Sequence, residues 1–203
     1  MKIICIGRNY ADHAKELNNA VPEDPVIFLK PQTALLGKGK DFYYPDFTQD
    51  LHYECELVVK IAKNGKHIQE KFAPKYYNEV TVGVDFTARD LQQKQKEKGL
   101  PWEIAKAFDN AAVVGDFVPL AELKSIGELS FQLQQNGEEK QHGFAKDMIF
   151  NIDQIIVYVS QFFTLNTGDL IFTGTPKGVG PVSKGDKLEG FLEGNKLFEF
   201  SIK

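Results

Sequence analysis

The stretch "LHYECELVVK" (residues 51–60) alternates apolar and polar side chains with a period of two, which is typical of a β-strand. Residues 53, 55, 57 and 59 share an apolar face, and the opposite face carries two carboxylates, Glu54 and Glu56. A rise of ~3.3 Å per residue separates them by roughly 7 Å. Like charges that close repel each other, and burial would remove their hydration. Either the strand lies at a sheet edge in water, or it is buried and a cation binds between the carboxylates.

Two features of this strand favour burial. His52 extends the polar face, and the apolar run at 57–59 gives the strand apolar side chains on both faces. Carboxylate oxygens without sulfur or imidazole ligands suit a hard cation rather than zinc. We therefore expect Mg²⁺ first, with Mn²⁺ or Ca²⁺ as the next candidates.

A third oxygen ligand is expected from the segment "VTVGVDFTARD" (residues 80–90). Asp85 falls in an otherwise apolar strand predicted over 80–87. Asp90 belongs to the charged helix that follows, where it could cap the helix or be solvated, as could Arg89. The residues themselves leave the choice between Asp85 and Asp90 open.

Two further segments carry candidate catalytic side chains. His13 and Glu16 are three residues apart in "NYADHAKELNN" (9–19), a predicted helix that Asn9 or Asp12 could cap. The pair would form a general base if Glu16 held one imidazole nitrogen, or else a surface ion pair. Lys106 lies among apolar residues, so it either extends to solvent or meets an anion.

The segment "TGTPKGVGPV" (173–182) is rich in glycine and follows an apolar strand, "DLIF". Its spacing of Gly174, Gly178 and Gly180 matches neither the P-loop nor the dinucleotide-binding pattern. We interpret it as a tight loop whose backbone approaches a ligand, with the Thr175 hydroxyl available to an oxyanion.

The overall composition is typical of a soluble globular protein. The 203 residues are 42% hydrophobic and 26% charged, with a formal net charge of −4, which gives no reason to expect nucleic acid as a partner. No apolar run approaches the ~20 residues that span a bilayer, and the N-terminal apolar run is too short for a signal peptide. Cys5 and Cys55 lie in apolar strand patterns, as buried free thiols would. We expect one cytoplasmic domain over residues 1–203 and no membrane partner.

Many short strands and few helices predict a β-rich α+β fold. Asn-Gly pairs at 64–65 and 136–137 predict hairpin turns. The segment 151–163 predicts an amphipathic helix, capped by Asn151 or Asp153. No regular alternation of strand and helix is seen.

Six segments, in this order along the chain, resemble the fumarylacetoacetate hydrolase family, specifically its single-domain acylpyruvate hydrolase and oxaloacetate decarboxylase branch. They are "GRNYADHAKE", "FLKPQTA", "HYECELVVKI", "VGVDFTARDLQ", "KGLPWEIAKAFD" and "GDLIFTGTPKGVGPV". The resemblance implies the mixed β-sandwich roll of the family's C-terminal domain and a homodimer. It also implies that Glu54, Glu56 and Asp85 bind one Mg²⁺ or Mn²⁺.

The resemblance further implies roles for the remaining candidates. It makes His13 and Glu16 a water-activating pair on a segment that closes over substrate, and it places Lys106 beside the metal to stabilise an anion. The residues that it implies around the substrate are Arg8, Gln92 and Thr175.

The implied substrate is a small 2-oxo acid. The expected reaction is C–C bond cleavage through a pyruvate enolate, by acylpyruvate hydrolysis, oxaloacetate decarboxylation or both. The His13–Glu16 pair favours these reactions, because proton transfer alone needs no activated water. A 2-hydroxyhepta-2,4-diene-1,7-dioate isomerase is the alternative within the family. A non-catalytic, metal-stabilised binding module is a further alternative, although it would need only the carboxylates.

Overall fold

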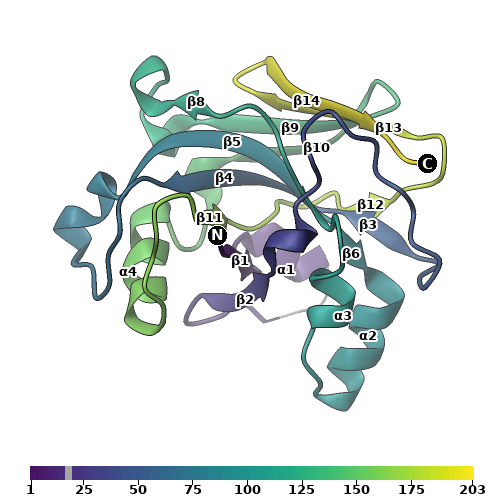
Figure 1. The fold of residues 1–203 in the computed structure, drawn as a ribbon, viewed down its shortest axis with the longest axis horizontal. Coiled ribbons are helices and arrows are strands. Elements are labelled where there is room, and N and C mark those ends of the chain that lie inside the picture. Colours follow the sequence, from purple (N-terminus) through teal and green to yellow (C-terminus); the bar gives the residue numbers. More distant parts are fainter. Residues whose placement is uncertain (17–19) are drawn as a thin grey trace.

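Strands are the main regular secondary structure of the described residues, and the helices lie at the periphery (Figure 1). This computed structural model describes residues 1–16 and 20–203. Its largest sheet has seven strands among the described residues. In spatial order they are β2 (Val26–Lys30), β1 (Ile3–Gly7), β11 (Leu170–Phe172), β4 (Cys55–Ile61), β5 (Tyr77–Asp85) and β7 (Ala112–Val114), with β8 (Val118–Pro119) also paired to β5.

Two smaller sheets complete the β-structure of the described residues. A four-stranded antiparallel sheet, at the top of Figure 1, contains β10 (Glu138–Phe144), β9 (Ser130–Gln135), β13 (Lys187–Leu192) and β14 (Asn195–Ser201). A three-stranded sheet contains β12 (Gly180–Pro181), β3 (Leu51–Tyr53) and β6 (Thr87–Ala88). The predicted strand-rich α+β class is confirmed.

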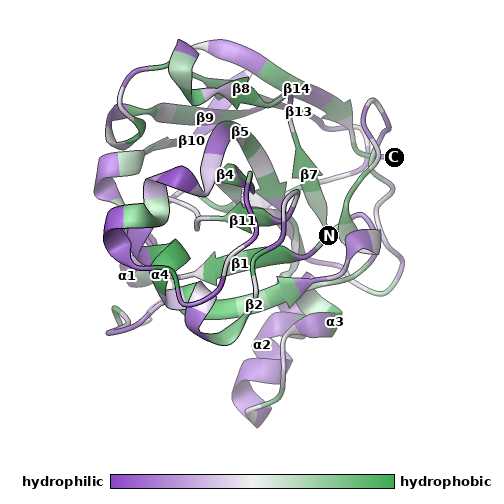
Figure 2. Ribbon diagram, turned by 60° about the vertical axis from the view of Figure 1, so that its left-hand side comes forward, coloured by the Kyte–Doolittle hydropathy of each residue, from purple (hydrophilic) through white to green (hydrophobic). Residues whose placement is uncertain are grey.

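The helices lie outside these sheets. Figure 2 shows hydrophobic residues concentrated on the strands of the largest sheet, whereas α2 is strongly hydrophilic and projects away from it. The α-helices are α1 (Ala11–Glu16), α2 (Arg89–Lys98), α3 (Glu103–Lys106) and α4 (Ile152–Phe162). The 3₁₀ helices are Gln32–Ala34, Glu70–Lys75, Leu120–Glu122, Ile126–Glu128 and Ala145–Asp147.

The strand predicted at 51–60 is present and is buried, which excludes the sheet-edge alternative. It is divided at Glu54 into β3 and β4, and β4 lies between β11 and β5 in the middle of the largest sheet. The antiparallel register pairs Cys55 with Val84, and the backbone N–H of Asp85 donates to the Glu54 carbonyl at 2.8 Å. This register brings the end of β5 beside the two glutamates.

The two Asn-Gly pairs behave differently. Asn136 and Gly137 have positive φ angles of 55° and 82° and close the predicted β9–β10 hairpin, as a type I′ turn requires. The hairpin predicted at 64–65 is wrong, because a longer connection that includes the 3₁₀ helix Glu70–Lys75 joins β4 to β5. Gly65 pairs with Leu165 instead, and a Cβ at this position would lie 2.3 Å from the Tyr76 ring. Glycine there permits a close contact rather than a turn.

The predicted helices are also found, with one difference at a cap. The helix predicted at 9–19 is seen as α1, while residues 17–19 lie outside the described part of the chain. Asn9 does not cap it, because its side chain bonds to backbone groups of Phe150 and Thr173. Cys5 and Cys55 are free and buried, as predicted. Within the described residues, no helix is both long and apolar enough to cross a membrane.

Asn151 is the N-cap of α4 and forms a capping box with Gln154. Its side-chain Oδ1 accepts from the Gln154 N–H at 3.0 Å, and Gln154 Oε1 accepts from the Asn151 N–H at 2.9 Å. Two N–H groups that the helix cannot satisfy are thereby paired.

We expect Asn151→Ala to lower the free energy of unfolding by about 1 kcal/mol, because one of these N–H groups loses its acceptor. Urea denaturation measures the difference. Gln161→Ala, at an exposed position in the last turn of the same helix, is the matched control and should change the stability by less than about 0.5 kcal/mol. Equal effects of the two substitutions would contradict a capping role.

Candidate active site

Three carboxylates from two neighbouring chain segments meet beneath a pocket. Glu54 lies between β3 and β4, Glu56 is in β4, and Asp85 ends β5. One oxygen from each lies within 4.8 Å of the others, and all three side chains are buried. The structure thus brings together the acidic residues that the sequence predicts as ligands. Asp90 lies elsewhere, where it accepts from Thr48 Oγ1 at 2.6 Å and from the Leu91 N–H.

Two buried lysines compensate part of this negative charge. Lys106, at the end of α3, donates from Nζ to Glu54 Oε2 and Asp85 Oδ2, both at 2.8 Å. Lys30, in β2, lies with its Nζ 2.6 Å from Asp85 Oδ1 and also bonds to the Ala111 carbonyl at 3.2 Å. Burial lowers the pKa of Lys106, but the charges of Asp85 and Glu54 outweigh that effect and raise it. Lys106 is therefore held as a cation against the carboxylates.

Arg89 gives Glu54 a second cationic partner. Its Nη2 lies 2.6 Å from Glu54 Oε1, while Nη1 donates to Gln92 Oε1 at 2.7 Å. Gln92 uses its carbonyl oxygen for this contact. Among residues 1–16 and 20–203 its NH₂ group has no acceptor, so it is available to an anionic ligand. Arg89 does not merely cap or solvate α2, as the sequence alone allowed.

The carboxylates differ in how far nearby groups compensate their negative charge. Burial opposes ionisation of Glu54, but the charges of Lys106 and Arg89 outweigh it and hold its pKa well below the usual range. Burial raises the pKa of Glu56 well above its ordinary value, and the charges of Asp85 and Glu54 raise it further. Glu56 accepts a hydrogen bond from the Gly174 N–H at 2.7 Å. A cation beside Glu56 would offset the cost of its ionisation, so this oxygen-only set fits a hard divalent ion.

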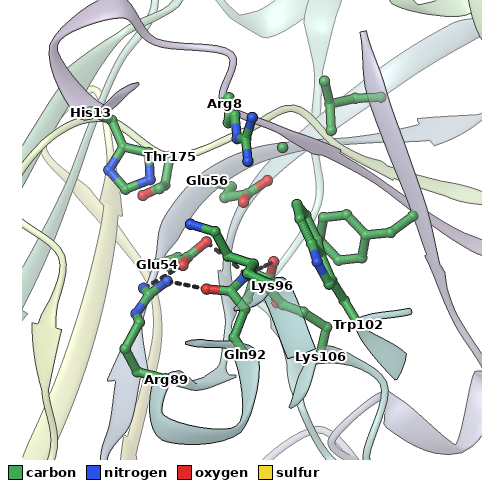
Figure 3. A pocket seen from close by; sticks show the side chains of 14 residues that line it. Arg8, His13, Glu54, Glu56, Arg89, Gln92, Lys96, Trp102, Lys106 and Thr175 are labelled. Atoms are coloured by element: carbon green, nitrogen blue, oxygen red, sulfur yellow. Dashed lines mark hydrogen bonds and ion pairs between the residues drawn. The ribbon is translucent and has the colours of Figure 1, made fainter. Parts of the chain in front are cut away.

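The predicted general-base pair faces the same pocket. His13 Nδ1 lies 3.1 Å from Glu16 Oε2 on α1, and the His13 side chain is buried. This contact leaves Nε2 as the ring nitrogen available for proton transfer. Figure 3 shows the imidazole on the same side of the pocket as Thr175. The surface ion-pair alternative does not fit a buried imidazole that lines a pocket.

The glycine-rich segment supports several of these groups at once. The Gly174 N–H binds Glu56, the Thr175 side chain lines the pocket, and the Gly178 N–H donates to Glu16 Oε1 at 3.0 Å. Gly174 and Gly178 have φ angles of 99° and 96°, a region that favours glycine. The predicted tight loop is thus found, although its backbone binds the protein's own carboxylates.

The pocket contains all of the predicted site residues except Glu16, which lies behind His13. Figure 3 shows them converging from both sides, with Arg8 and Trp102 on the wall opposite His13. The Arg8 guanidinium carbon lies 5.9 Å from the centre of the Trp102 ring, and Arg8 has a positive φ of 60°. The lining residues are Ile6, Gly7, Arg8, His13, Phe28, Glu54, Glu56, Asp85, Arg89, Gln92, Lys96, Trp102, Lys106 and Thr175.

Comparison with known proteins agrees with this geometry. The family model described as "Fumarylacetoacetate (FAA) hydrolase C-terminal" matches residues 2–203. The chain belongs to the fumarylacetoacetate hydrolase family. It is 44% identical over 201 residues to the mitochondrial oxaloacetate tautomerase of Mus musculus, covering 99% of this chain and 91% of that protein. It is 43% identical over 197 residues to the oxaloacetate tautomerase of Escherichia coli (strain K12), covering 97% and 90%.

A solved structure extends the comparison. Fumarylpyruvate hydrolase from Pseudomonas aeruginosa, in complex with Mn²⁺ and pyruvate, matches with a TM-score of 0.93 and 38% identity, covering 100% of this chain and 89% of that one. The family fold expected from the sequence is therefore confirmed.

Two residues at the base of the site were not identified from the sequence. Lys30 falls in "FLKPQTA", a segment that resembles the family, but a lysine in an apolar strand gives no sign of its ionic partner. Arg89 was considered only as a helix-capping or solvated residue. Their positions next to Asp85 and Glu54 follow from the packing of β2 and α2, which spacing along the chain does not show.

We expect Mn²⁺ or Mg²⁺ to raise the thermal unfolding midpoint, because an ion that binds only the native state adds about 2.7 kcal/mol at 100 times its Kd. Glu56→Gln should remove most of this gain. Without metal, that variant should be at least as stable as the native sequence, because it removes a buried and poorly compensated charge.

The matched control is Glu97→Gln on α2, an exposed position outside the pocket that should keep the full metal-dependent gain. If Glu56→Gln also kept it, the ion would bind elsewhere. Differential scanning fluorimetry over a metal titration, after chelation, gives both comparisons.

Proposed function

We propose that this protein is a divalent-metal-dependent enzyme that interconverts the keto and enol forms of oxaloacetate. The observation that carries the proposal is the position of Lys106, which lies between Glu54 and Asp85 in the same pocket that His13 faces. A cation, a carboxylate set and a general base are then available around one small molecule. The names of the mouse and bacterial relatives support oxaloacetate as the substrate.

The charge of the pocket supports a dicarboxylate. Its lining includes the cationic side chains of Arg8, Arg89 and Lys106 together with the three carboxylates. A divalent ion on the carboxylates would leave the pocket clearly cationic. Oxaloacetate brings two negative charges, and the NH₂ group of Gln92 can donate to one of them.

Glu54, Glu56 and Asp85 would hold the metal, which we propose to be Mg²⁺ or Mn²⁺. When bound, the ion supplies Lewis acidity that polarises the substrate's keto oxygen. The match to a structure that contains Mn²⁺ and pyruvate supports this assignment.

His13 transfers the proton at carbon, and Lys106 stabilises the charge that develops. His13 Nε2 removes the proton from the carbon between the keto group and the distal carboxylate, and Glu16 stabilises the imidazolium that results. Lys106 stays protonated and offsets the negative charge that develops on the enolate oxygen. The enolate oxygen then takes a proton from solvent water to complete the enol. In the opposite direction, the enol oxygen loses its proton to water, and the His13 imidazolium returns a proton to the same carbon.

Acylpyruvate hydrolysis is the second candidate function. The buried His13–Glu16 pair could activate water for attack on the distal carbonyl, and the fumarylpyruvate hydrolase match supports it. Oxaloacetate decarboxylation and diene-dioate isomerisation would use the same enolate-stabilising groups. Self-association into a homodimer and a cytoplasmic location also remain proposals.

The first test follows the ultraviolet absorbance of enol oxaloacetate, with pyruvate measured in parallel. We expect Mg²⁺ or Mn²⁺ to support rapid loss of the enol without pyruvate, and EDTA to abolish it. His13→Ala should slow this reaction by about 10²-fold, because it removes the general base. His67→Ala, at an exposed position outside the pocket, is the control and should leave the rate unchanged. A native protein without metal-dependent turnover would refute the proposal.

The second candidate is tested with acetylpyruvate. Hydrolysis releases pyruvate and acetate in equal amounts, and we expect His13→Ala to slow it by about 10²-fold or more. Pyruvate formed from acetylpyruvate by the native protein but not by His13→Ala would assign C–C cleavage to this site. Cleavage that survives in His13→Ala would remove the water-activating role.

A further inference from the structure

Gln141 is a buried amide on the inner side of the β9–β10 hairpin, next to the active site but outside the pocket lining. Strand β10 is otherwise largely exposed, and its pairing with β9 shifts register between Glu139 and Gln141. Such a bulge re-aims a side chain. Here the residue that follows the bulge is 2% exposed and turned into the protein.

The hydrogen bonds of Gln141 connect the metal-binding strand to the glycine-rich loop. Its Oε1 accepts from the Cys55 N–H at 2.8 Å, and Cys55 lies between Glu54 and Glu56. Its Nε2 donates to the Pro176 carbonyl at 2.9 Å and to Thr175 Oγ1 at 2.8 Å. All of these interactions are buried.

The hydrogen-bond partners of Gln141 determine the positions of its amide oxygen and its NH₂ group. A backbone N–H can only donate and a carbonyl can only accept, so Cys55 requires the Gln141 oxygen and Pro176 requires its NH₂ group. The NH₂ group therefore faces Thr175, and the Thr175 oxygen must accept. Within residues 1–16 and 20–203, the Thr175 hydroxyl has no protein acceptor for its own hydrogen. That hydrogen is free to point into the pocket that Thr175 lines.

The hairpin is built to approach the loop closely. A Cβ on Gly143 would lie 2.9 Å from the Pro176 ring, and a Cβ on Gly178 would lie 2.5 Å from the Lys140 carbonyl oxygen. Glycine at both positions lets β10 lie directly against residues 175–178. The Gln141 amide bonds to the loop within this close contact.

We propose that Gln141 is a positioning residue that makes Thr175 a hydrogen-bond donor to the oxyanion formed in the reaction. Gln141 does not touch the substrate and acts through the Thr175 hydroxyl. The proposal rests on the proposed function, because it requires a substrate oxygen that gains negative charge in this pocket.

Gln141→Glu tests the direction of the hydrogen bond with almost no change of shape. One carboxylate oxygen can still accept from Cys55. The other now accepts the Thr175 proton that the substrate would receive, and the Pro176 carbonyl loses its donor. We expect kcat for enol oxaloacetate to fall by about 10- to 100-fold, with KM changed by less than about threefold, because an oxyanion contact acts mainly in the transition state. Gln132→Glu makes the same chemical change on β9, outside the pocket, and should leave kcat unchanged.

A double-mutant comparison shows whether Gln141 acts through Thr175. Thr175→Val should lower kcat by about 10- to 100-fold, and adding Gln141→Glu to it should lower kcat by less than a further threefold or so. Thr175→Ser, which keeps the hydroxyl, should retain most of the activity. Multiplied losses in the double variant, or a Gln141→Glu rate within about twofold of native, would overturn the proposal.

Two controls separate this proposal from its alternatives. All variants should keep the metal-dependent gain in thermal stability, and its loss in Gln141→Glu would show a structural role in the carboxylate cluster instead. If Gln141→Glu does not fold, Gln141→Met takes its place in the same double-mutant comparison. A native protein that turns over no 2-oxo acid refutes the proposed function and this role with it, whereas active native protein with an unaffected Gln141→Glu refutes this role alone.

Discussion

The burial of three carboxylates against two lysines is the constraint on which the rest of the site depends. Removing Glu54, Glu56 and Asp85 from water is costly, and their mutual repulsion adds to that cost. Lys106 and Lys30 offset it from one side, and the Gly174 N–H contributes from the other. Strands, α3 and the glycine-rich loop must therefore all be in place before the charges are tolerated.

The parts of the site that could be predicted from the sequence are those whose pattern is local. Glu54 and Glu56 are two residues apart in one strand, and His13 and Glu16 are one helical turn apart, so spacing alone placed each pair on one face. The neighbouring residues did not decide whether Asp85 or Asp90 is the third metal ligand, and the family resemblance favoured Asp85. The β9–β10 hairpin and the Asn151 cap were predicted for the same reason, because their signals lie within a few residues.

The parts that were missed depend on contacts between distant segments. In the sequence, Lys30 only interrupts an apolar strand, and its ionic partner Asp85 is known from the structure alone. Gln141 looks like any other polar residue on an exposed strand. Asn64-Gly65 carries a strong turn signal, yet the approach of the Tyr76 ring, which follows from packing, determines its role. In each case, a contact with a residue from another element determined the structure, and the local sequence signal did not.

The order of these contacts along the chain has a consequence for folding during synthesis. Glu56 is 118 residues from its partner Gly174, and Glu16 is 162 residues from Gly178. Strand β1 pairs with β11, so the largest sheet cannot be completed until residues near 170 have been synthesised. Contacts this far apart slow folding. The nascent chain thus carries its acidic pair through most of translation without the loop that supports it, and the active site cannot be complete before residues 174–178 have been synthesised.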